Sequence, residues 1–506
     1  MGSLPKETLK RARLPIDLSK VKAQPQLNFE DTANPDSLIN GMRLYAKYMD
    51  AARNGPTSDQ KPEIPDSLAE RAHQAKSLCY FMDAFDVGCA SLTPDLFLKA
   101  PYINSDLAGF HSELEDFPTD RPGFHQHIAH GLHNGIEDNN SPITHHTHTV
   151  AIIYDHAREL TPDEAAYKWL YDTGRHRGSI RASETAIVLA NYLRALGFDA
   201  RAHTESTTDV DLNKVAVASG IVDVEGDGSI RHPYRGKQFS IAAVTTTMSL
   251  EPDTPLAPRN ALDKFKSHGP TWWLGGGVGH GKGMGTSKTA FNVEPYKNKS
   301  FETDIYGMSK IKRQDKTTNF IDEARVPRVP KRHDGFWRGY FGDLGPEVQA
   351  NSDDEFCVIK SVIAEAQYGL IGPLHLIERM EESPQIKPGN DNPEENAKKV
   401  KSALHFLGAD MVGISKAPDW VWYSHELDGE EIIPAHDHAI TLLIDQGHET
   451  MEGASGDDWI ASSQSMRAYM RGMLLGGILA EHIRSFGYKA QTHSVVDSDV
   501  LHMPLV

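Results

Sequence analysis

The segment PDWVWYSHE, residues 418–426, brings three large aromatic side chains together directly after a predicted strand. Strand ends are where α/β folds place their functional groups. Trp420, Trp422 and Tyr423 could therefore line a binding or catalytic site. Aromatic packing inside a core explains this segment, taken alone, equally well.

A second candidate is Lys489, which follows Gly487 in GYKAQTH, where a predicted helix gives way to a strand. An ordinary exposed lysine is the simpler explanation of this position.

Histidines form two clusters. GFHQHIAHGLHNG carries His125, His127, His130 and His133, and HHTHT carries His145, His146 and His148. His130 and His133 could face one metal ion if their segment is helical, because imidazole is a common ligand. No HExxH or carboxylate facial-triad pattern accompanies them, so we predict structural or surface histidines, with a metalloenzyme as the alternative.

The glycine-rich stretch WWLGGGVGHGKGMGTSK, residues 272–288, partly fits a phosphate-binding loop. Gly276 to Lys282 matches the first part of GxxxxGK, but Gly283 stands where Ser or Thr must reach magnesium. We predict a mobile or substrate-covering loop.

Composition limits the classes of function. The 506 residues are enough for roughly two to four domains, and the net charge of −18 argues against a general affinity for nucleic acid or anionic membranes. No apolar run approaches the ~18 residues of a membrane span, and the first residues contain no export signal, so we predict a cytoplasmic protein. Cys79, Cys89 and Cys357 are too few for a disulfide framework or a four-cysteine cluster.

An internal repeat organises the chain. Residues 76–88, KSLCYFMDAFDVG, and 401–413, KSALHFLGADMVG, share Lys, Ser, Phe, Ala, Val and Gly at an offset of 325. Residues 189–203 and 479–493 share Leu, Ala, Arg, Gly, Ala and His at an offset of 290. The two matches occur in the same order, which indicates a duplication with loop-length differences.

Each copy shows the same predicted order of elements. A helix at 70–82 or 396–407 leads into a short strand, FDVGCA or DMVGIS, and a second apolar strand follows at 149–155 or 438–445. The second strands are continuous apolar runs typical of strands buried on both faces. A long helix follows and ends near Gly197 or Gly487. This order predicts a parallel α/β arrangement.

The first copy continues through HPYRG and the strand FSIAAVTTTM at 239–248, whereas the second stops 13 residues after His493. We therefore expect the second copy to be incomplete and not to close alone. The expected domains are an N-terminal extension at 1–60, the first copy at 61–258, a connecting region of loops and helices at 259–390, and the second copy at 391–506.

With these motifs together, the sequence resembles the cobalamin-dependent reductive dehalogenases and, more distantly, the epoxyqueuosine reductases. KSALHFLGADMVGISKAPDWVWYSHE and AYMRGMLLGGILAEHIRSFGYKAQTH carry the resemblance, and HPYRGKQFSIAAVTTTMSLEPDTP extends it to the first copy. The closest likeness is to the cytosolic, catabolic branch. The resemblance implies an α/β fold of two tandem cobalamin-domain-like copies, the first degenerate and the second incomplete, so the chain looks like an N-terminal fragment.

The resemblance also implies an activity, reductive dehalogenation of a halogenated aromatic such as a halophenol or halohydroxybenzoate. Cobalamin would remove the halogen, and Tyr423 would protonate the carbon, with Lys489 as the cation that stabilises the phenolate. Arg484 is the alternative cation, but its match to Arg194 favours a structural use. The electron donor would be a ferredoxin or a flavin reductase.

One departure from the family concerns the iron-sulfur clusters. The family implies two [4Fe-4S] clusters, whose cysteines this chain lacks. Two alternatives stay open on the sequence. One is a non-catalytic corrinoid-family scaffold that needs a partner carrying the clusters, and the other is an epoxyqueuosine-reductase-like oxidoreductase.

Overall fold

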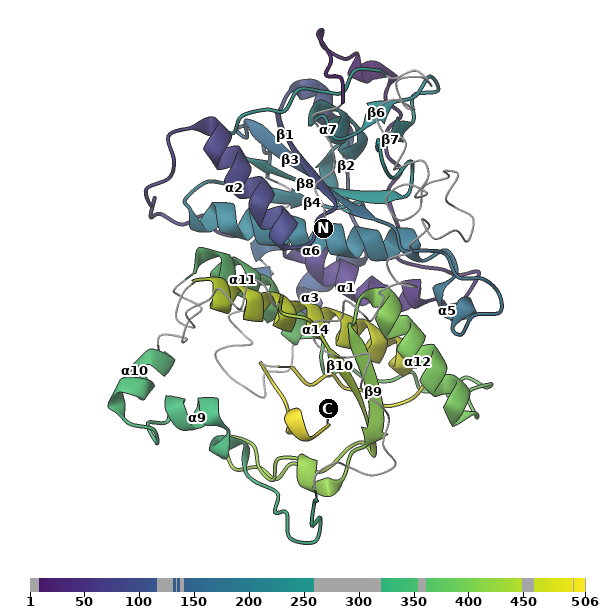
Figure 1. The fold of residues 1–506 in the computed structure, drawn as a ribbon, viewed down its shortest axis with the longest axis vertical. Helices are drawn as coiled ribbons and strands as arrows, with labels where there is room; N and C mark the ends of the chain where they lie inside the picture. Colours follow the sequence, from purple (N-terminus) through teal and green to yellow (C-terminus); the bar gives the residue numbers. More distant parts are fainter. Residues whose placement is uncertain are drawn as a thin grey trace, which may run out of the picture.

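The computed structural model describes residues 9–115, 131–132, 134–136, 141–258, 320–353, 361–447, 459–494 and 496–505. The first histidine cluster, the glycine-rich stretch and Cys357 lie outside these residues. Figure 1 shows a region with a sheet above and a smaller region with two strands below. Three long helices lie between them, α6 (Gly174–Ala195), α11 (Val362–His375) and α14 (Trp459–Ser485).

The sheet of the upper region has four strands in the order β1-β3-β8-β4. Their bounds are β1 (Asp86–Ser91), β3 (His148–Asp155), β8 (Phe239–Thr246) and β4 (Ala200–His203). All three neighbouring pairs are antiparallel, so the prediction of a parallel sheet is wrong. The predicted strands themselves are confirmed.

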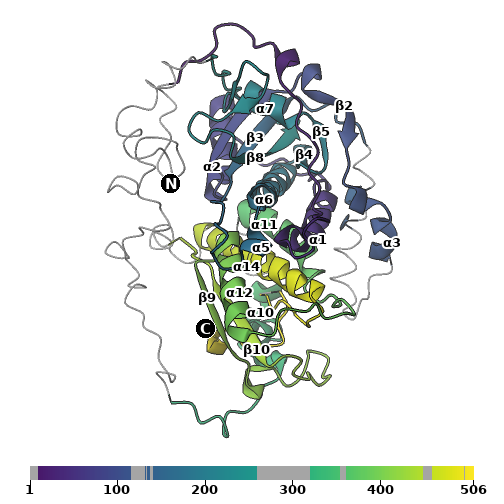
Figure 2. The same cartoon turned by 90° about the vertical axis from the view of Figure 1, so that its right-hand side faces the viewer.

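The physical reason is the position of β8. The helix α6 connects β3 to β4, and both of these strands run antiparallel to β8, so β3 and β4 are parallel to one another. This is the crossover that the order strand, helix, strand predicts. However, β8 lies between the two strands, as Figure 2 also shows, and turns each contact into an antiparallel pair.

The helices of the upper region begin where capping residues predict. Ser67 accepts a hydrogen bond from the N–H of Glu70 at the start of α2 (Leu68–Phe81), and Ser37 accepts one from Ile39 at the start of α1 (Leu38–Ala51). Gly197, just after α6, has a φ of 78°, which glycine adopts without strain. On the other side of the sheet, α7 (Leu212–Ala218) packs against β1, β3 and β8.

The lower region contains α12 (Pro393–Leu407), β9 (Met411–Lys416) and β10 (His438–Leu443), which confirm the helix and strands predicted for the second copy. The two strands form an antiparallel pair. The prediction that β10 is buried on both faces is wrong, because its residues are half-buried or exposed. It packs against α14. The prediction of a strand after Gly487 is wrong, because residues 488–494 form no strand.

The registers of the two strand pairs correspond residue by residue. Gly88 pairs with Ala151 in the upper region, and Gly413 pairs with Thr441 in the lower one. The first residue of the upper pair is related to its counterpart by the offset of 325, and the second residue by the offset of 290. All six residue pairs between β1 and β3 correspond in this way to the six pairs between β9 and β10.

One hydrophobic core connects both regions. Its buried residues run from Leu27 to Phe486, and α1, from the expected N-terminal extension, packs against α14, α6 and α11. The remaining elements are short: η2 (Leu18–Lys20), η3 (Pro94–Leu96), β2 (Phe97–Tyr102), η4 (Ser105–Leu107), α3 (Phe110–Glu115), α5 (Tyr167–Leu170), β5 (Thr208–Val210), β6 (Asp223–Val224), β7 (Ile230–Arg231), η8 (Lys331–His333), α9 (Gly335–Tyr340), α10 (Pro346–Asp353), η10 (Asp419–Val421) and η11 (Met503–Leu505).

Candidate active site around Tyr423

The backbone of Tyr423 is held from two sides. Its N–H donates to the carbonyl of Asp499 at 2.8 Å, and its own carbonyl accepts from the Arg328 guanidinium at 2.6 Å. Next to it, Trp422 forms an antiparallel bridge with Val500. Tyr423 therefore lies in a short two-stranded segment just after the turn η10. The ring of Tyr423 packs in a cluster with Trp422 and Val500.

The phenol of Tyr423 donates a hydrogen bond to Oδ2 of Asp334 at 3.2 Å. The other oxygen of Asp334, Oδ1, accepts the N–H of Phe336 and caps the start of α9. This cap fixes the carboxylate, and the carboxylate orients the phenol. Asp334 lies 89 residues before Tyr423 in the sequence, and we did not identify it from the sequence.

Burial raises the pKa of Tyr423 above its usual value, and the negative charge and the accepting hydrogen bond of Asp334 raise it further. The phenol therefore keeps its proton throughout the neutral pH range. The same setting makes Tyr423 a weak acid until its anion is stabilised.

Lys489 is exposed and lies on the segment that follows α14. Among the described residues, no hydrogen bond or ion pair joins it to Tyr423, whose phenol bonds to Asp334. Its charge acts instead on His436, whose pKa is lowered by burial first and by Lys489 next. The ring of His436 stacks on Trp422, the neighbour of Tyr423, with 6.1 Å between ring centroids.

Arg484 has a structural role. It is 1% exposed, and its guanidinium donates to the carbonyl of Ala490 at 2.9 Å. Arg194 makes the matching bond to Ala200 at 2.7 Å in the upper region. Both arginines therefore fix the chain that follows their helix, as the sequence match predicts.

A buried ionic network supports the segment that carries Asp499. Lys331, which is 3% exposed, donates to Glu426, Asp497 and Asp499 at 2.7, 3.0 and 3.3 Å. Arg379 donates to the same two aspartates at 2.8 and 2.7 Å. Burial alone would raise the pKa of Asp499, but Arg379 and Lys331 outweigh it and lower this pKa, so the carboxylate stays charged.

Three polar groups on the segments of Trp422 and His493, whose rings are in contact, lack partners among the described residues. The indole N–H groups of Trp420 and Trp422 and the hydroxyl of Thr492 are buried and have no hydrogen-bond partner among the described residues. Buried donors are normally satisfied. Cobalamin carries several amide carbonyls on its rim, so these donors fit such a ligand. We therefore regard the three residues as the group that would hold it.

Two small cavities among the described residues enclose about 170 and 220 Å³ of empty space. Neither is lined by Tyr423 or Lys489.

The cysteines do not fit an iron-sulfur cluster. Two four-cysteine clusters need about eight thiolates, and the chain has 3 cysteines. Cys79 and Cys89 are buried in the upper region, and burial raises the pKa of the Cys79 thiol, which disfavours the ligating thiolate.

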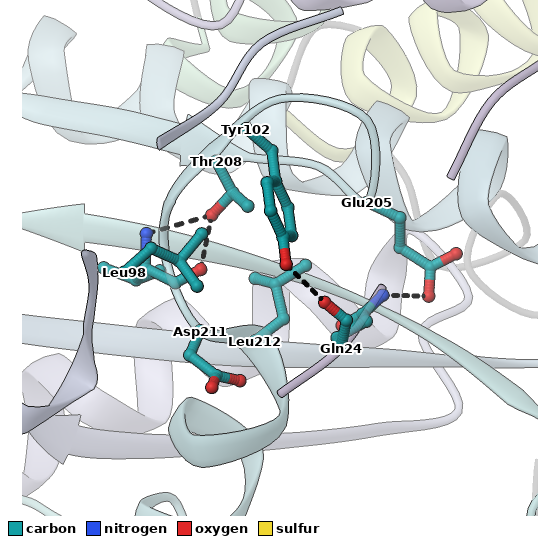
Figure 3. Close-up of a pocket in the computed structure, with 8 residues that line it drawn as sticks. Gln24, Leu98, Tyr102, Glu205, Thr208, Asp211 and Leu212 are labelled. Carbon is teal, nitrogen blue, oxygen red and sulfur yellow. Dashed lines mark hydrogen bonds between the residues drawn. The ribbon is translucent and has the colours of Figure 1, made fainter. Parts of the chain in front are cut away.

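The equivalent place in the upper region is closed. The bridge Trp422–Val500 corresponds, at the two offsets, to the pair Phe97–Val210, so Leu98 occupies the position of Tyr423. The smaller cavity lies there (Figure 3). Gln24 from the N-terminal segment enters it, bonds to Glu205 at 2.5 Å and accepts from the hydroxyl of Tyr102 at 3.0 Å. The upper region therefore has Leu98, and no phenol, at the position that matches Tyr423, and the phenol of Tyr102 is bonded to Gln24.

Comparison with solved structures identifies the fold. The catabolic reductive dehalogenase NpRdhA matches with a TM-score of 0.77 and 31% sequence identity over 98% of this chain. The chain has the fold of a catabolic reductive dehalogenase. It spans 64% of the length of that enzyme.

Further structures agree. NpRdhA in complex with 3-bromo-4-hydroxybenzoic acid matches with a TM-score of 0.76 and 31% identity over 98% of this chain and 64% of its own. Another match is a reductive dehalogenase whose structure suggests a mechanism for B12-dependent dehalogenation. Its TM-score is 0.77 and its sequence identity 31%, and the match covers 99% of this chain and 64% of that enzyme. The homologous structures are thus oxidoreductases of one kind.

Epoxyqueuosine reductase is a distant neighbour. One such structure has a TM-score of 0.24 and 12% identity, and it covers 38% of this chain and 50% of its own. No protein-family model matches the sequence, and no curated protein does.

Proposed function

We propose that this protein takes part in the reductive dehalogenation of a halogenated aromatic compound, with cobalamin as its cofactor. The observation that carries this proposal is the likeness to catabolic reductive dehalogenases over 98% of the chain at 31% identity. The neighbour with bound 3-bromo-4-hydroxybenzoic acid supports a halophenol or halohydroxybenzoate as the substrate class.

Bound cobalamin would supply the two-electron chemistry that breaks the carbon–halogen bond. The overall change replaces a halogen on the ring by hydrogen, so it consumes two electrons and one proton and releases a halide ion. The electrons would come from a ferredoxin or a flavin reductase. The residues of this chain would bind the substrate, exclude water and deliver the proton.

Tyr423 is our proposed proton donor. Its phenol is protonated at neutral pH and oriented by Asp334, and its ring packs beside Trp422 in an apolar cluster that limits the access of water. After transfer, the phenolate would lie next to the Asp334 carboxylate, which is unfavourable. A cation is therefore needed nearby to lower the pKa of Tyr423.

We propose Lys489 as the cation that stabilises the phenolate of Tyr423, because the family resemblance implies this role. What supports it in the structure is its effect on His436, which stacks on the residue next to Tyr423. Lys489 would then act through the electric field of the site and not through a direct bond.

We also propose that the two regions are copies of one ancestral domain, the first of which has lost its site. Three observations support this. The strand registers agree with both sequence offsets, Arg194 and Arg484 make matching bonds, and Leu98 stands where the second copy has Tyr423. The same register puts Asp199 at the position of Lys489.

The test is to measure cobalamin binding and bromide release together. The protein with cobalamin bound is reduced anaerobically with a chemical reductant and mixed with 3-bromo-4-hydroxybenzoic acid. We expect Tyr423→Phe to keep the cobalamin absorption spectrum but to lose at least about 100-fold in bromide release, since general acids contribute about 10²- to 10⁴-fold. Tyr102→Phe, which changes the matching region of the first copy, should keep full activity.

The same experiment distinguishes an active dehalogenase from the non-catalytic scaffold, the alternative that the small number of cysteines favours. Cobalamin binding without bromide release from the wild-type protein would support a corrinoid-binding scaffold that needs a partner. Unchanged activity in Tyr423→Phe would contradict the proposed proton donor, and absence of cobalamin binding would contradict both functions.

A further inference from the structure

Two histidines and an aspartate meet at one end of the four-stranded sheet, far in sequence from Tyr423. Nε2 of His145 lies 2.6 Å from Oδ2 of Asp199, and Nε2 of His146 lies 3.3 Å from the same oxygen. The candidate ligand atoms of the three side chains all lie within 4.8 Å of one another. We call these residues the His-His-Asp cluster.

The fold fixes this cluster at the end of the sheet. His145 and His146 lie just before β3, and Asp199 lies just before β4. The carbonyl of Asp199 accepts hydrogen bonds from the hydroxyl of Thr246 at 2.8 Å and from the N–H of Thr247 at 3.0 Å. The end of β8 therefore fastens the aspartate beside the histidines.

His146 has a buried nitrogen that points into the cluster. Its side chain is fully buried, and its Nε2 has no hydrogen-bond partner among the described residues, although Asp199 is near. The other nitrogen, Nδ1, lies 2.8 Å from Oγ1 of Thr245. When Nδ1 donates its proton to that hydroxyl, Nε2 presents a lone pair to the cluster, as in metal-bound histidines.

From this geometry we propose that His145, His146 and Asp199 bind a divalent transition-metal ion such as Zn²⁺. Two imidazole nitrogens and one carboxylate are typical ligands of zinc, and three protein ligands leave a fourth position for water. His145 and Asp199 are partly exposed, with 54% and 44% of their side chains accessible, so an ion can enter from solvent.

The ion would replace the contacts of the two histidines with Asp199 by three metal–ligand bonds. It would also join the segment before β3 to the segment before β4, and thus the ends of two strands that β8 separates. The site does not depend on the proposed dehalogenation. The second copy holds the lysine ammonium of Lys489 at the position of Asp199, so each copy would carry a cation there.

The test uses the full chain without an affinity tag, stripped with a chelator and titrated with Zn²⁺ by calorimetry. We expect one strong equivalent and a rise in melting temperature with Zn²⁺, because a ligand that binds the folded state stabilises it. Asp199→Asn and His145→Ala should each weaken this binding at least about 100-fold, since even outer-shell partners are worth about 10- to 100-fold.

His148→Ala is the matched control, because His148 belongs to the same sequence motif but bonds to Thr147 at 2.8 Å. It should bind Zn²⁺ like the wild type. Two results would overturn the proposal: no stoichiometric binding by the wild type, or equal binding by the wild type and both cluster variants. Asp199→Asn replaces one carboxylate oxygen by an amide nitrogen and keeps the size of the side chain. If this variant loses Zn²⁺ binding while its metal-free form melts at the same temperature as the wild type, unfolding is excluded as the cause.

Discussion

At the scale of single residues, Asp334 changes the view of Tyr423. The family resemblance implies a cation beside the phenol, but the group that bonds to it is the Asp334 carboxylate, at 3.2 Å. The carboxylate keeps the phenol protonated and oriented. The cost is a less stable phenolate, so Tyr423 would donate only when the reaction itself creates a strong demand for a proton.

Replacing Asp334 by Asn should lower the pKa of Tyr423. The change removes the charge that disfavours the phenolate, and Asn caps a helix about as well as Asp, so α9 should persist. The pKa can be followed by NMR titration of ¹³C-labelled tyrosine, with the signal assigned by its loss in Tyr423→Phe. A pKa that stays unchanged in Asp334→Asn would show that burial alone sets it.

The sequence makes Tyr423 a candidate but gives no reason to choose Asp334, because only the folded chain brings the two together. The available signal was local: Asp334 precedes Gly335 and an aromatic helix, which is typical of a helix start. It says nothing about what the second carboxylate oxygen contacts. Similarly, the motif HHTHT was visible, but its metal-binding arrangement requires Asp199, 54 residues away.

At the scale of elements, α14 shows how closely the helices between the two regions pack. A methyl group at Gly477 would overlap the hydroxyl and ring of Tyr45, which is fully buried on α1. The absence of a side chain at Gly477 thus permits the close approach of α1 and α14.

We predict that Gly477→Ala lowers the free energy of unfolding by about 1–3 kcal/mol, the usual cost of overpacking a core. Gly472 lies on the same helix, but there the nearest atom to an added methyl is Leu442 Cδ1 at 4.0 Å. Gly472→Ala should therefore be neutral or stabilise the protein by up to about 1 kcal/mol. Urea unfolding of both variants tests this, and equal effects would contradict it.

The predicted elements agree well with the structure, but their pairing does not. Apolar runs and capping residues define β3, α6 and α12 locally, so the sequence reveals them. Which strand lies beside which depends on where β8, a later strand, enters the sheet. The exposure of β10 also follows from its neighbours and not from its own apolar sequence.

At the scale of the whole molecule, Asp83 joins the two regions. It follows α2 with a φ of 72° and forms ion pairs with Arg181 of α6 and with Arg467 and Arg471 of α14. Burial alone would raise the pKa of Asp83, but the three arginines outweigh it and lower this pKa. The carboxylate therefore stabilises the folded state when it is charged.

We expect Asp83→Asn to destabilise the protein by about 1–3 kcal/mol at pH 7, less than for a fully buried pair because a third of the side chain is exposed. Asn tolerates positive φ, so the backbone should not be strained. Because the folded-state pKa is below the unfolded value of about 3.9, the contribution is complete above that pH and is lost as the pH falls through the folded-state pKa. Thermal melts of both proteins should therefore differ at pH 7 and converge in acid, whereas a constant difference would contradict this.

The place of β8 has a consequence for synthesis on the ribosome. β3 and β4 are made first, yet they meet only through β8, about 90 residues after β3 begins. A nascent chain would thus carry an unpaired edge of β3 for that interval, and an unpaired β4 for its last part, when such edges are prone to wrong pairing. Chaperone dependence should be greatest in that window and should fall once β8 has emerged.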